Sequence, residues 1–395
     1  MNSTLYLAAG AVSSLMGLYA SWSLLRRATI FQNAAQRIAL IAFITVASGF
    51  LCFMVGQEQF FSRETAASLV PAAVFFACFA PLLFLAALTC DIVAGVRTLL
   101  ARRRGQAAPG KDTFSLVLLV GLLVLAMVFA VVGGWNGLGE AFEEEQKVYV
   151  KDLPEGLEGF RIVQVSDLHA SPVFNAERTA ALVKRINAMK PDAVVITGNS
   201  ADGQIELRGP DLAPLKDLKS TYGTYAVPGR FDYLVGWAGL KEIYQAAGVT
   251  VLENGGRALD VKGTKLLIAG IADPSSGIKT AVTEEGAEDA VSAALAAAPD
   301  AAFKVLLANN SLAALEASRH GVQLQISSLA PGSQFDLWRR LAGGTKAGLL
   351  PGLFRYSGML VFASQGEAVW SGLPMRLGTW NEVNLITLTG KPVTK

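Results

Sequence analysis

Four long apolar runs, none of which contains Asp, Glu, Lys or Arg, restrict what the first 135 residues can fold into. They are Leu5–Leu25, Ile38–Val55, Leu69–Cys90 and Phe114–Val132, and each has 18 to 22 residues. As α-helices they would be about 27 to 33 Å long, which matches the hydrocarbon core of a bilayer. Four consecutive uncharged runs of this length argue against buried helices of a soluble protein. The sequence therefore predicts an all-α bundle of four transmembrane helices over residues 1–135, surrounded by lipid.

The charges that flank these runs predict how the bundle is oriented. Basic residues follow the first run and lie between the third and fourth runs, whereas the segment after the fourth run is acidic. Because basic loops stay on the cytoplasmic side, the N-terminus and everything after residue 135 are expected outside the cytoplasmic membrane, in a periplasm or extracellular space. The residues concerned are Arg26, Arg27 and Arg37, then Arg97, Arg102, Arg103, Arg104 and Lys111, and finally Glu140, Glu143, Glu144 and Glu145.

A second domain begins where the composition changes. The chain is 52% hydrophobic with a mean hydropathy of +0.40, but from about Glu140 charged residues, glycines and short apolar runs alternate as in water-soluble α/β domains. This change predicts a linker over 136–154 and a domain over 155–392. The net charge of +2, without a basic stripe, excludes nucleic acid as an expected partner. All three cysteines lie in the apolar runs, so the domain has no thiol for a disulfide or a zinc site.

Short β-rich runs and helical runs alternate through this second domain. The first pair is a strand at 161–165 and a helix at 176–189, whose Leu182, Ile186 and Met189 share one face. The alternation predicts an α/β fold with a site at the carboxyl ends of its strands. The other expected strands are 193–197, 223–227, 265–269, 304–308, 323–326, 359–363 and 382–388, and the other expected helices are 212–219, 237–247, 287–298 and 312–318.

Several sequence blocks of this domain resemble a known family. The first reads Leu-Glu-Gly-Phe-Arg-Ile-Val-Gln-Val-Ser-Asp-Leu-His over 157–169 and resembles the opening block of membrane-anchored calcineurin-like metallophosphoesterases, whose first strand ends in an Asp-x-His metal motif. The resemblance covers about residues 155–390 and implies two packed mixed sheets flanked by helices, with the active site on loops at the strand ends. The later blocks follow in the family's order at 191–198, 225–229, 305–308, 321–327 and 372–378.

The resemblance also implies a two-metal site, and most of its ligand positions have changed in this chain. The Asp-x-His motif is intact as Asp167 and His169. The Gly-Asp motif that would supply a bridging carboxylate ends in Asn199, which has no negative charge, and the Gly-Asn-His-Glu block reads Gly-Arg-Phe-Asp over 229–232. The histidines expected in two later motifs are also missing. The changed positions are Asn199, Arg230, Phe231, Asn309, Leu329 and Pro331.

These changes bear directly on metal binding. Two dications side by side repel each other and require a bridging carboxylate and several neutral ligands. By resemblance only Asp167 and His169 remain as metal ligands, and the other histidine of the chain, His320, is expected at a helix end. No catalytic residue and no resident cofactor are therefore expected. We expect a cation, first of all Arg230, to pair with Asp167 and fill the former metal pocket, so that Arg230→Asn would destabilise the domain.

These features leave three candidate functions. The favoured interpretation is a membrane-anchored, catalytically inactive family member that binds, scaffolds or regulates an unknown protein or a phosphate-containing ligand. The alternative is a phosphoester hydrolase with one weakly held Mn, Fe or Zn ion at Asp167 and His169, helped by Asp202 or Asp232. Transport through the four helices is disfavoured, because the apolar runs lack the charges and the paired broken helices that mark a pathway.

Overall fold

The computed structural model describes residues 2–27, 33–107, 113–272, 287–328 and 351–392, and these residues form two compact units. The first unit contains residues 1–136 together with 371–377, and the second contains 137–370 and 378–395. Leu329 and Pro331 lie outside the described residues.

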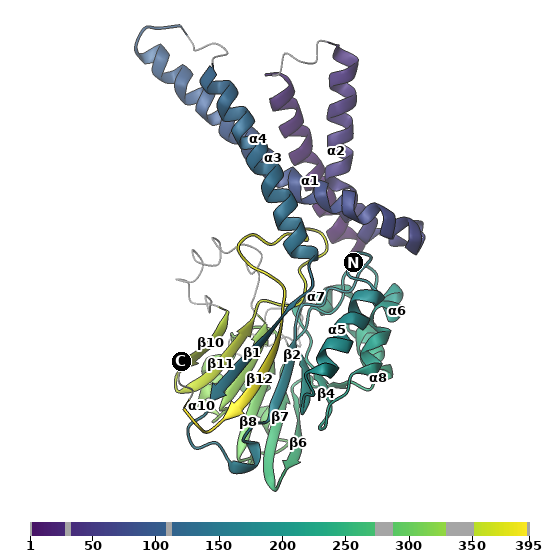
Figure 1. Ribbon diagram of the computed structural model, residues 1–395, viewed down its shortest axis with the longest axis vertical. Helices are drawn as coiled ribbons and strands as arrows, with labels where there is room; N and C mark the ends of the chain where they lie inside the picture. The colour runs from purple at the N-terminus through teal and green to yellow at the C-terminus, as the bar shows by residue number, and fades with distance from the viewer. Residues whose placement is uncertain (1, 28–32, 108–112, 273–286, 329–350, 393–395) are drawn as a thin grey trace. The chain divides into compact units, whose positions relative to one another are not determined.

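The first unit contains the four apolar helices (Figure 1). All four are long and apolar enough to cross a membrane. Small residues bring the first two together: a Cβ atom on Gly49 would lie 2.5 Å from the backbone oxygen of Gly10. The third is longer than its apolar run, because charged residues extend it at both ends. The helices are α1 (Asn2–Leu25), α2 (Ala34–Gly56), α3 (Arg63–Arg103) and α4 (Thr113–Leu138), with a 3₁₀ turn, η1, at Glu58–Phe60.

A segment from far along the sequence belongs to this unit as well. Residues 371–377 were expected within the second domain, but they pack among the helices. The backbone N–H of Arg376 donates to the carbonyl oxygen of Gly133 at 2.9 Å, and the thiol of Cys52 donates to the carbonyl oxygen of Gly372 at 3.5 Å. A Cβ atom on Gly133 would lie 2.5 Å from Cγ of Met375. The absence of a side chain at Gly133 therefore makes room for this segment.

The second unit contains two six-stranded mixed sheets, as the resemblance implies. In the first sheet β2, β3, β4 and β5 are parallel, and in the second β7, β8, β9 and β11 are parallel. The first sheet has the order β1 (Phe142–Tyr149), β12 (Glu382–Thr389), β2 (Arg161–Val165), β3 (Ala193–Ile196), β4 (Thr224–Ala226), β5 (Thr250–Val251). The second has the order β10 (Gly352–Tyr356), β11 (Met359–Ser364), β9 (Leu324–Ser328), β8 (Phe303–Ala308), β7 (Thr264–Gly270), β6 (Gly255–Val261).

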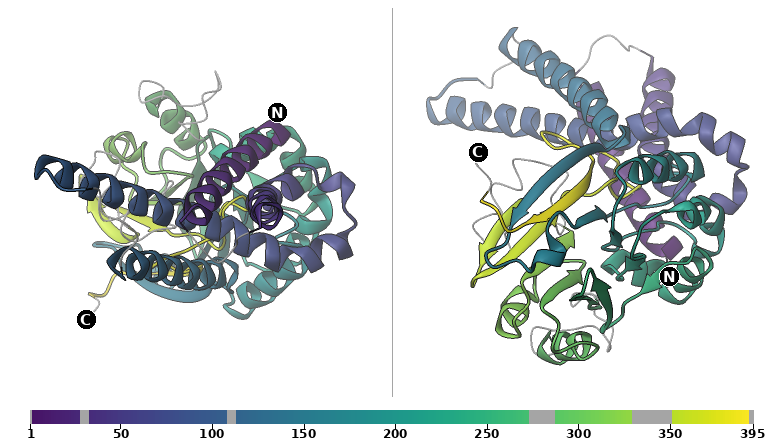
Figure 2. Two further views of the ribbon diagram at one scale, coloured as in Figure 1. Left: turned by 90° about the horizontal axis from the view of Figure 1, so that it is seen from above. Right: turned by 60° about the horizontal axis from the view of Figure 1, so that its bottom comes forward.

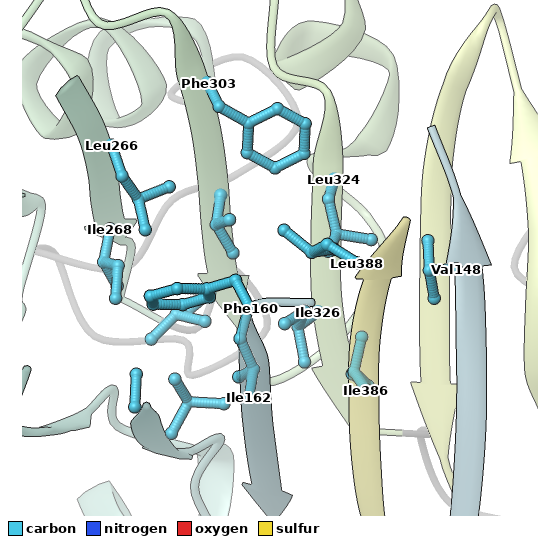
Figure 3. Close-up of a cluster of buried hydrophobic side chains, with 14 of the residues drawn as sticks. Val148, Phe160, Ile162, Leu266, Ile268, Phe303, Leu324, Ile326, Ile386 and Leu388 are labelled. Atoms are coloured by element: carbon cyan, nitrogen blue, oxygen red, sulfur yellow. The ribbon is translucent and has the colours of Figure 1, made fainter. Parts of the chain in front are cut away.

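The main core lies between the two sheets. Figure 3 shows Ile162 and Ile386 of the first sheet meeting Ile268 and Ile326 of the second, and all four side chains are fully buried. A second apolar cluster joins α5 (Ala176–Ala188) and α8 (Trp237–Ala246) to the outer face of the first sheet, and a third joins α9 (Ala287–Leu295) and α10 (Ala314–Arg319) to the second sheet. The unit is thus a sandwich of two sheets between two layers of helices.

Two stretches differ from the sequence-based expectations. The segment 136–154, expected as a linker, contains β1, which pairs in parallel with β12 over eight residues; both Figure 1 and the right-hand view of Figure 2 show the two side by side. This edge strand exposes its acidic residues and buries only Val148, so its apolar pattern is weak. The helix expected at 212–219 is replaced by α6 (Gly209–Leu212) and a 3₁₀ turn, η4 (Ala213–Asp217), because Pro214 has no N–H to continue a helix.

Candidate functional site

The candidate site lies where neighbouring parallel strands end. The strands β2, β3 and β4 end at Val165, Ile196 and Ala226, which are adjacent in the sheet. The loops that follow carry Asp167 and His169, then Asn199 and Asp202, and then α7 (Arg230–Val235). Parallel strands bring their carboxyl ends to one edge, so these polar residues meet although they are far apart in sequence.

Asp167 and Asn199 are joined by a side-chain hydrogen bond. The Nδ2 of Asn199 donates to Oδ1 of Asp167 at 2.7 Å, and the other carboxylate oxygen of Asp167 accepts from the hydroxyl of Ser166. The backbone N–H of Phe231 donates to Oδ1 of Asn199 at 3.0 Å. Because a backbone N–H only donates, the amide oxygen of Asn199 must face Phe231, and its NH₂ group must face Asp167. Asn199 therefore presents a hydrogen-bond donor at the position that the resemblance gives to a bridging carboxylate.

His169 is buried between two carboxylates and an aromatic ring. Its Nδ1 lies 3.1 Å from Oδ1 of Asp202, which is fully buried, and its Nε2 lies 3.9 Å from Oδ1 of Asp167. The ring of Phe231 packs edge-on against the imidazole, with 5.3 Å between the ring centroids. Burial would lower the pKa of His169, but the negative charges of Asp202, Asp167 and Asp232 outweigh it and raise the pKa above its usual value.

Asp232 holds two of the loops together rather than facing the site. Its carboxylate accepts hydrogen bonds from the backbone N–H groups of Asn199 at 2.9 Å, Ser200 at 2.7 Å and Gly229 at 2.8 Å. Desolvation by burial nevertheless raises the pKa of Asp232 to about 6. Asp232 was a candidate helper for a single metal ion, but its carboxylate is already used by three backbone donors.

Asn309, Gly198 and Gly229 pack closely together next to Asn199. The Nδ2 of Asn309 donates to the carbonyl oxygen of Thr197 at 2.7 Å. A Cβ atom on Gly198 would lie 2.4 Å from the backbone nitrogen of Gly229, and a Cβ atom on Gly229 would lie 2.7 Å from Nδ2 of Asn309. The loops are therefore packed backbone against backbone, and the Asn309 side chain is used to tie the second sheet to the first.

The backbone at the site is strained. Three non-glycine residues of the site adopt left-handed conformations, with φ of 55° at Asp167, 45° at His169 and 56° at Asn199. Each such residue costs of the order of 1 kcal/mol or more, and such strain is concentrated at functional sites. The loop geometry typical of an active site is thus present around side chains that mostly differ from those of the family.

Arg230 does not pair with Asp167 among the residues that the structure describes, so the expectation that Arg230 takes this role was wrong. Both residues are described, and Arg230 is exposed on the first turn of α7, while Asp167 is 8% exposed and bonded to Asn199 and Ser166. The first residues of α7 place the Phe231 ring, rather than the guanidinium, against His169. The Asn199 amide bonds to Asp167 and the Phe231 ring lies against His169, where Arg230 was expected.

Arg230→Asn is accordingly expected to leave the thermal stability of the full chain unchanged within about 0.5 kcal/mol, as for other exposed side chains. Thermal unfolding of the detergent-solubilised protein measures this directly. A marked drop in the melting temperature would show that Arg230 does pair with the site.

The sequence missed two features of the site. One is the carboxylate–imidazole contact of Asp202 with His169, which the spacing of Asn199 to Asp202 did not reveal. The other is a buried polar network beneath the site, in which Nε2 of Gln164 donates to Oγ1 of Thr197 at 3.0 Å and the hydroxyl of Ser328 donates to the Thr197 carbonyl oxygen at 2.9 Å. Alternating hydrophobic patterns cannot show polar residues that face inward from a strand end.

A pair of metal ions does not fit the side chains that the structure describes here. Among the described ranges, no three His, Cys, Asp or Glu side chains are grouped so as to hold a metal ion. Asn199 directs an N–H toward Asp167, and Asp232 is used by three backbone donors. Asn199 and Asp232 are therefore not oriented as metal ligands. Asp167 and His169 are the two potential ligands whose side chains face one another.

Comparisons with known proteins found relatives that are named for a metallophosphoesterase domain. A "Transmembrane protein with metallophosphoesterase domain" from Danio rerio is 27% identical over 398 residues, which cover 98% of this chain and 86% of that protein. A protein of the same name from Bos taurus is 28% identical over 378 residues, covering 90% of this chain and 81% of its own. An uncharacterized metallophosphoesterase from Bacillus subtilis is 32% identical over 189 residues, which cover 47% of this chain and 63% of that protein. No family model matches the sequence.

Proposed function

We propose, on the premise that this chain belongs to the membrane-associated metallophosphoesterases, that it is a catalytically inactive member of the family. Its function would be to bind, scaffold or regulate a protein or a phosphate-containing ligand at the membrane surface. The observation that carries this proposal is the orientation of Asn199, whose NH₂ group donates to Asp167 because Phe231 N–H holds its oxygen. A donor at this position cannot bridge two cations.

The surroundings of Asn199 support the same proposal. Phe231 covers the imidazole of His169 with an apolar ring, and the Nδ2 of Asn309 donates to the backbone carbonyl of Thr197. Each of these residues makes a definite stabilising contact. Three of the changed positions, Asn199, Phe231 and Asn309, therefore make polar and aromatic contacts with other residues of the chain itself.

The orientation in the membrane belongs to this proposal too. The basic segments after α1 and at the end of α3 are expected in the cytoplasm, and the N-terminus and the second unit outside, in a periplasm or extracellular space. The proposed partner, whether a protein or a phosphate-containing molecule, would then meet the cluster on the outer face of the cytoplasmic membrane. Modification of single cysteines placed near Asn2 or Asp217 by an impermeant thiol reagent on intact cells tests this orientation.

A second candidate function is supported by one contact. The carboxylate of Asp202 lies 3.1 Å from Nδ1 of His169, and this arrangement leaves Nε2 facing Asp167. Carboxylates hold metal-binding histidines in this way, so a single Mn, Fe or Zn ion on Asp167 and His169 is the alternative. Two protein ligands are fewer than the three that catalytic metal sites usually have.

Metal loading and hydrolysis, measured on the same preparation, separate these two functions. The full chain would be purified in detergent, incubated with Mn²⁺, Fe²⁺ or Zn²⁺, freed of unbound metal and assayed with an aryl phosphodiester. We expect less than one metal ion per chain and no hydrolysis above that of Asp167→Ala. Stoichiometric metal, with turnover that Asp167→Ala abolishes and Asp217→Ala retains, would establish the hydrolase instead.

A further inference from the structure

A charged cavity in the first unit is not explained by anchoring alone. It has a volume of about 610 Å³ and lies between the end of α1 and the last part of α3. Its lining includes Arg26, Arg27, Asp91, Gly95 and Arg102. Three guanidinium groups and one carboxylate leave a formal excess of two positive charges in this cavity.

Asp91 holds the first two of these guanidinium groups in place. Its Oδ1 accepts hydrogen bonds from Nη2 of both Arg26 and Arg27, while its Oδ2 accepts from the hydroxyls of Tyr19 at 2.7 Å and Ser23 at 2.6 Å. One carboxylate cannot neutralise two guanidinium groups. In addition, Nη1 of Arg27 is buried and has no hydrogen-bond partner among the residues that the structure describes. A buried charged donor without a partner is costly, and an anion would satisfy it.

The cavity lies at the depth of lipid headgroups. The 26 residues between Glu64 and Asp91 carry no charge, and as helix they extend about 39 Å, enough to cross the hydrocarbon core. Asp91 therefore marks the point where α3 leaves the apolar core. Trp22 is 51% exposed, and the guanidinium of Arg26 lies 4.5 Å from the centroid of its ring, an arrangement typical of the membrane interface.

The lining also leaves room for a ligand. A Cβ atom on Gly95 would meet no atom within 4 Å, so the wall of α3 at this point is open. Arg102 lies seven residues further along α3, about two turns away and on the same side as Gly95. Arg26 and Arg27, which directly follow α1, and Arg102 of α3 thus line the same cavity.

We propose that this cavity binds the phosphate of an anionic phospholipid headgroup. Guanidinium groups form paired hydrogen bonds with phosphate oxygens, and Asp91 already fixes two of the three. The bilayer supplies phosphate groups at this depth, whereas a water-soluble phosphate has the same chemistry and would compete for the same donors. The site is independent of the proposed function of the second unit, because it involves only residues of α3 and of the turn that follows α1.

The test compares lipids on the full chain in detergent. Thermal unfolding is followed during titration with dioctanoyl-phosphatidylglycerol, with zwitterionic dioctanoyl-phosphatidylcholine, and with inorganic phosphate. We expect saturable stabilisation by phosphatidylglycerol and none by phosphatidylcholine. Arg102→Gln should weaken the apparent affinity about fivefold, in line with ~1 kcal/mol for each basic residue near an anionic surface. Arg103→Gln, which removes the same charge outside the lining, should leave the affinity unchanged.

A second variant fills the cavity without removing charge. Gly95→Leu should abolish the stabilisation by phosphatidylglycerol, whereas Gly121→Leu in α4, where a Cβ atom also meets no atom within 4 Å, should retain it. Equal stabilisation by inorganic phosphate that Arg102→Gln weakens would keep the site and identify a soluble phosphate as its ligand. Equal stabilisation by both lipids, or equal losses with Arg102→Gln and Arg103→Gln, would overturn the proposal.

Discussion

Asp232→Ala should destabilise the full chain by about 3 to 5 kcal/mol, because it removes the acceptor of three buried backbone N–H groups. These donors belong to Asn199, Ser200 and Gly229, in two separate loops, and no solvent replaces the lost carboxylate at a position that is 0% exposed. Thermal unfolding in detergent measures the loss. The matched control is Asp217→Ala, an exposed aspartate whose replacement should change stability by less than about 0.5 kcal/mol.

The raised pKa of Asp232 gives the same variant a second readout. Because the pKa is about 6 in the folded chain and 3.8 without burial, the folded chain keeps this proton over a range where the unfolded chain has lost it. The unfolding free energy of the wild type should therefore fall as the pH rises from about 4 through about 6. Asp232→Ala lacks this contribution. If both destabilisation and pH dependence were the same in Asp232→Ala and Asp217→Ala, Asp232 would not hold the loops together.

Gly198→Ala should also destabilise the full chain strongly. The new Cβ atom would lie 2.4 Å from the nitrogen and 2.6 Å from the Cα of Gly229, so a backbone segment must move. The φ of +89° adds the strain of a left-handed alanine. Together these effects should cost about 3 kcal/mol or more, by overpacking and backbone strain.

Gly159→Ala separates the contribution of backbone strain to the destabilisation from that of overpacking. Gly159 has a φ of +78°, close to that of Gly198, but a Cβ atom there would meet nothing within 4 Å. Its replacement should therefore cost only the conformational part, about 1 kcal/mol. Similar melting temperatures for Gly198→Ala and Gly159→Ala would mean that the two loops do not pack backbone against backbone.

The overall architecture could be predicted from the sequence because its signals are local. Four uncharged apolar runs give four helices, and Ile162, Val194 and Val305 lie in short apolar runs that read directly as buried strands. The edge strand β1 was missed since it exposes its glutamates and depends on pairing with β12, which lies more than 200 residues away. The association of 371–377 with the helices was missed for a similar reason, because its partners, such as Gly133, are recognisable only in three dimensions.

The candidate site was predicted in its positions but not in its contacts. Asp167, His169, Asn199 and Phe231 follow strands of one sheet whose ends share an edge, and Asn309, which follows β8 of the second sheet, lies against them. The sequence suggested that Arg230 would pair with Asp167, whereas the structure places the Asn199 amide against Asp167 and the Phe231 ring against His169. The direction of a side chain at the start of a short helix depends on its neighbours in three dimensions. The periodic pattern of the sequence does not predict it. The sequence therefore could not show that Phe231, and not Arg230, lies against His169.

The number of metal ions bound per chain tests the central claim most directly. After incubation of the purified full chain with Mn²⁺ and removal of unbound metal, elemental analysis should find less than one Mn per chain, and Asp167→Ala should not change that number. Two Mn ions per chain, lost in Asp167→Ala, would mean that the Asn199 amide turns away and that the site still holds a metal pair.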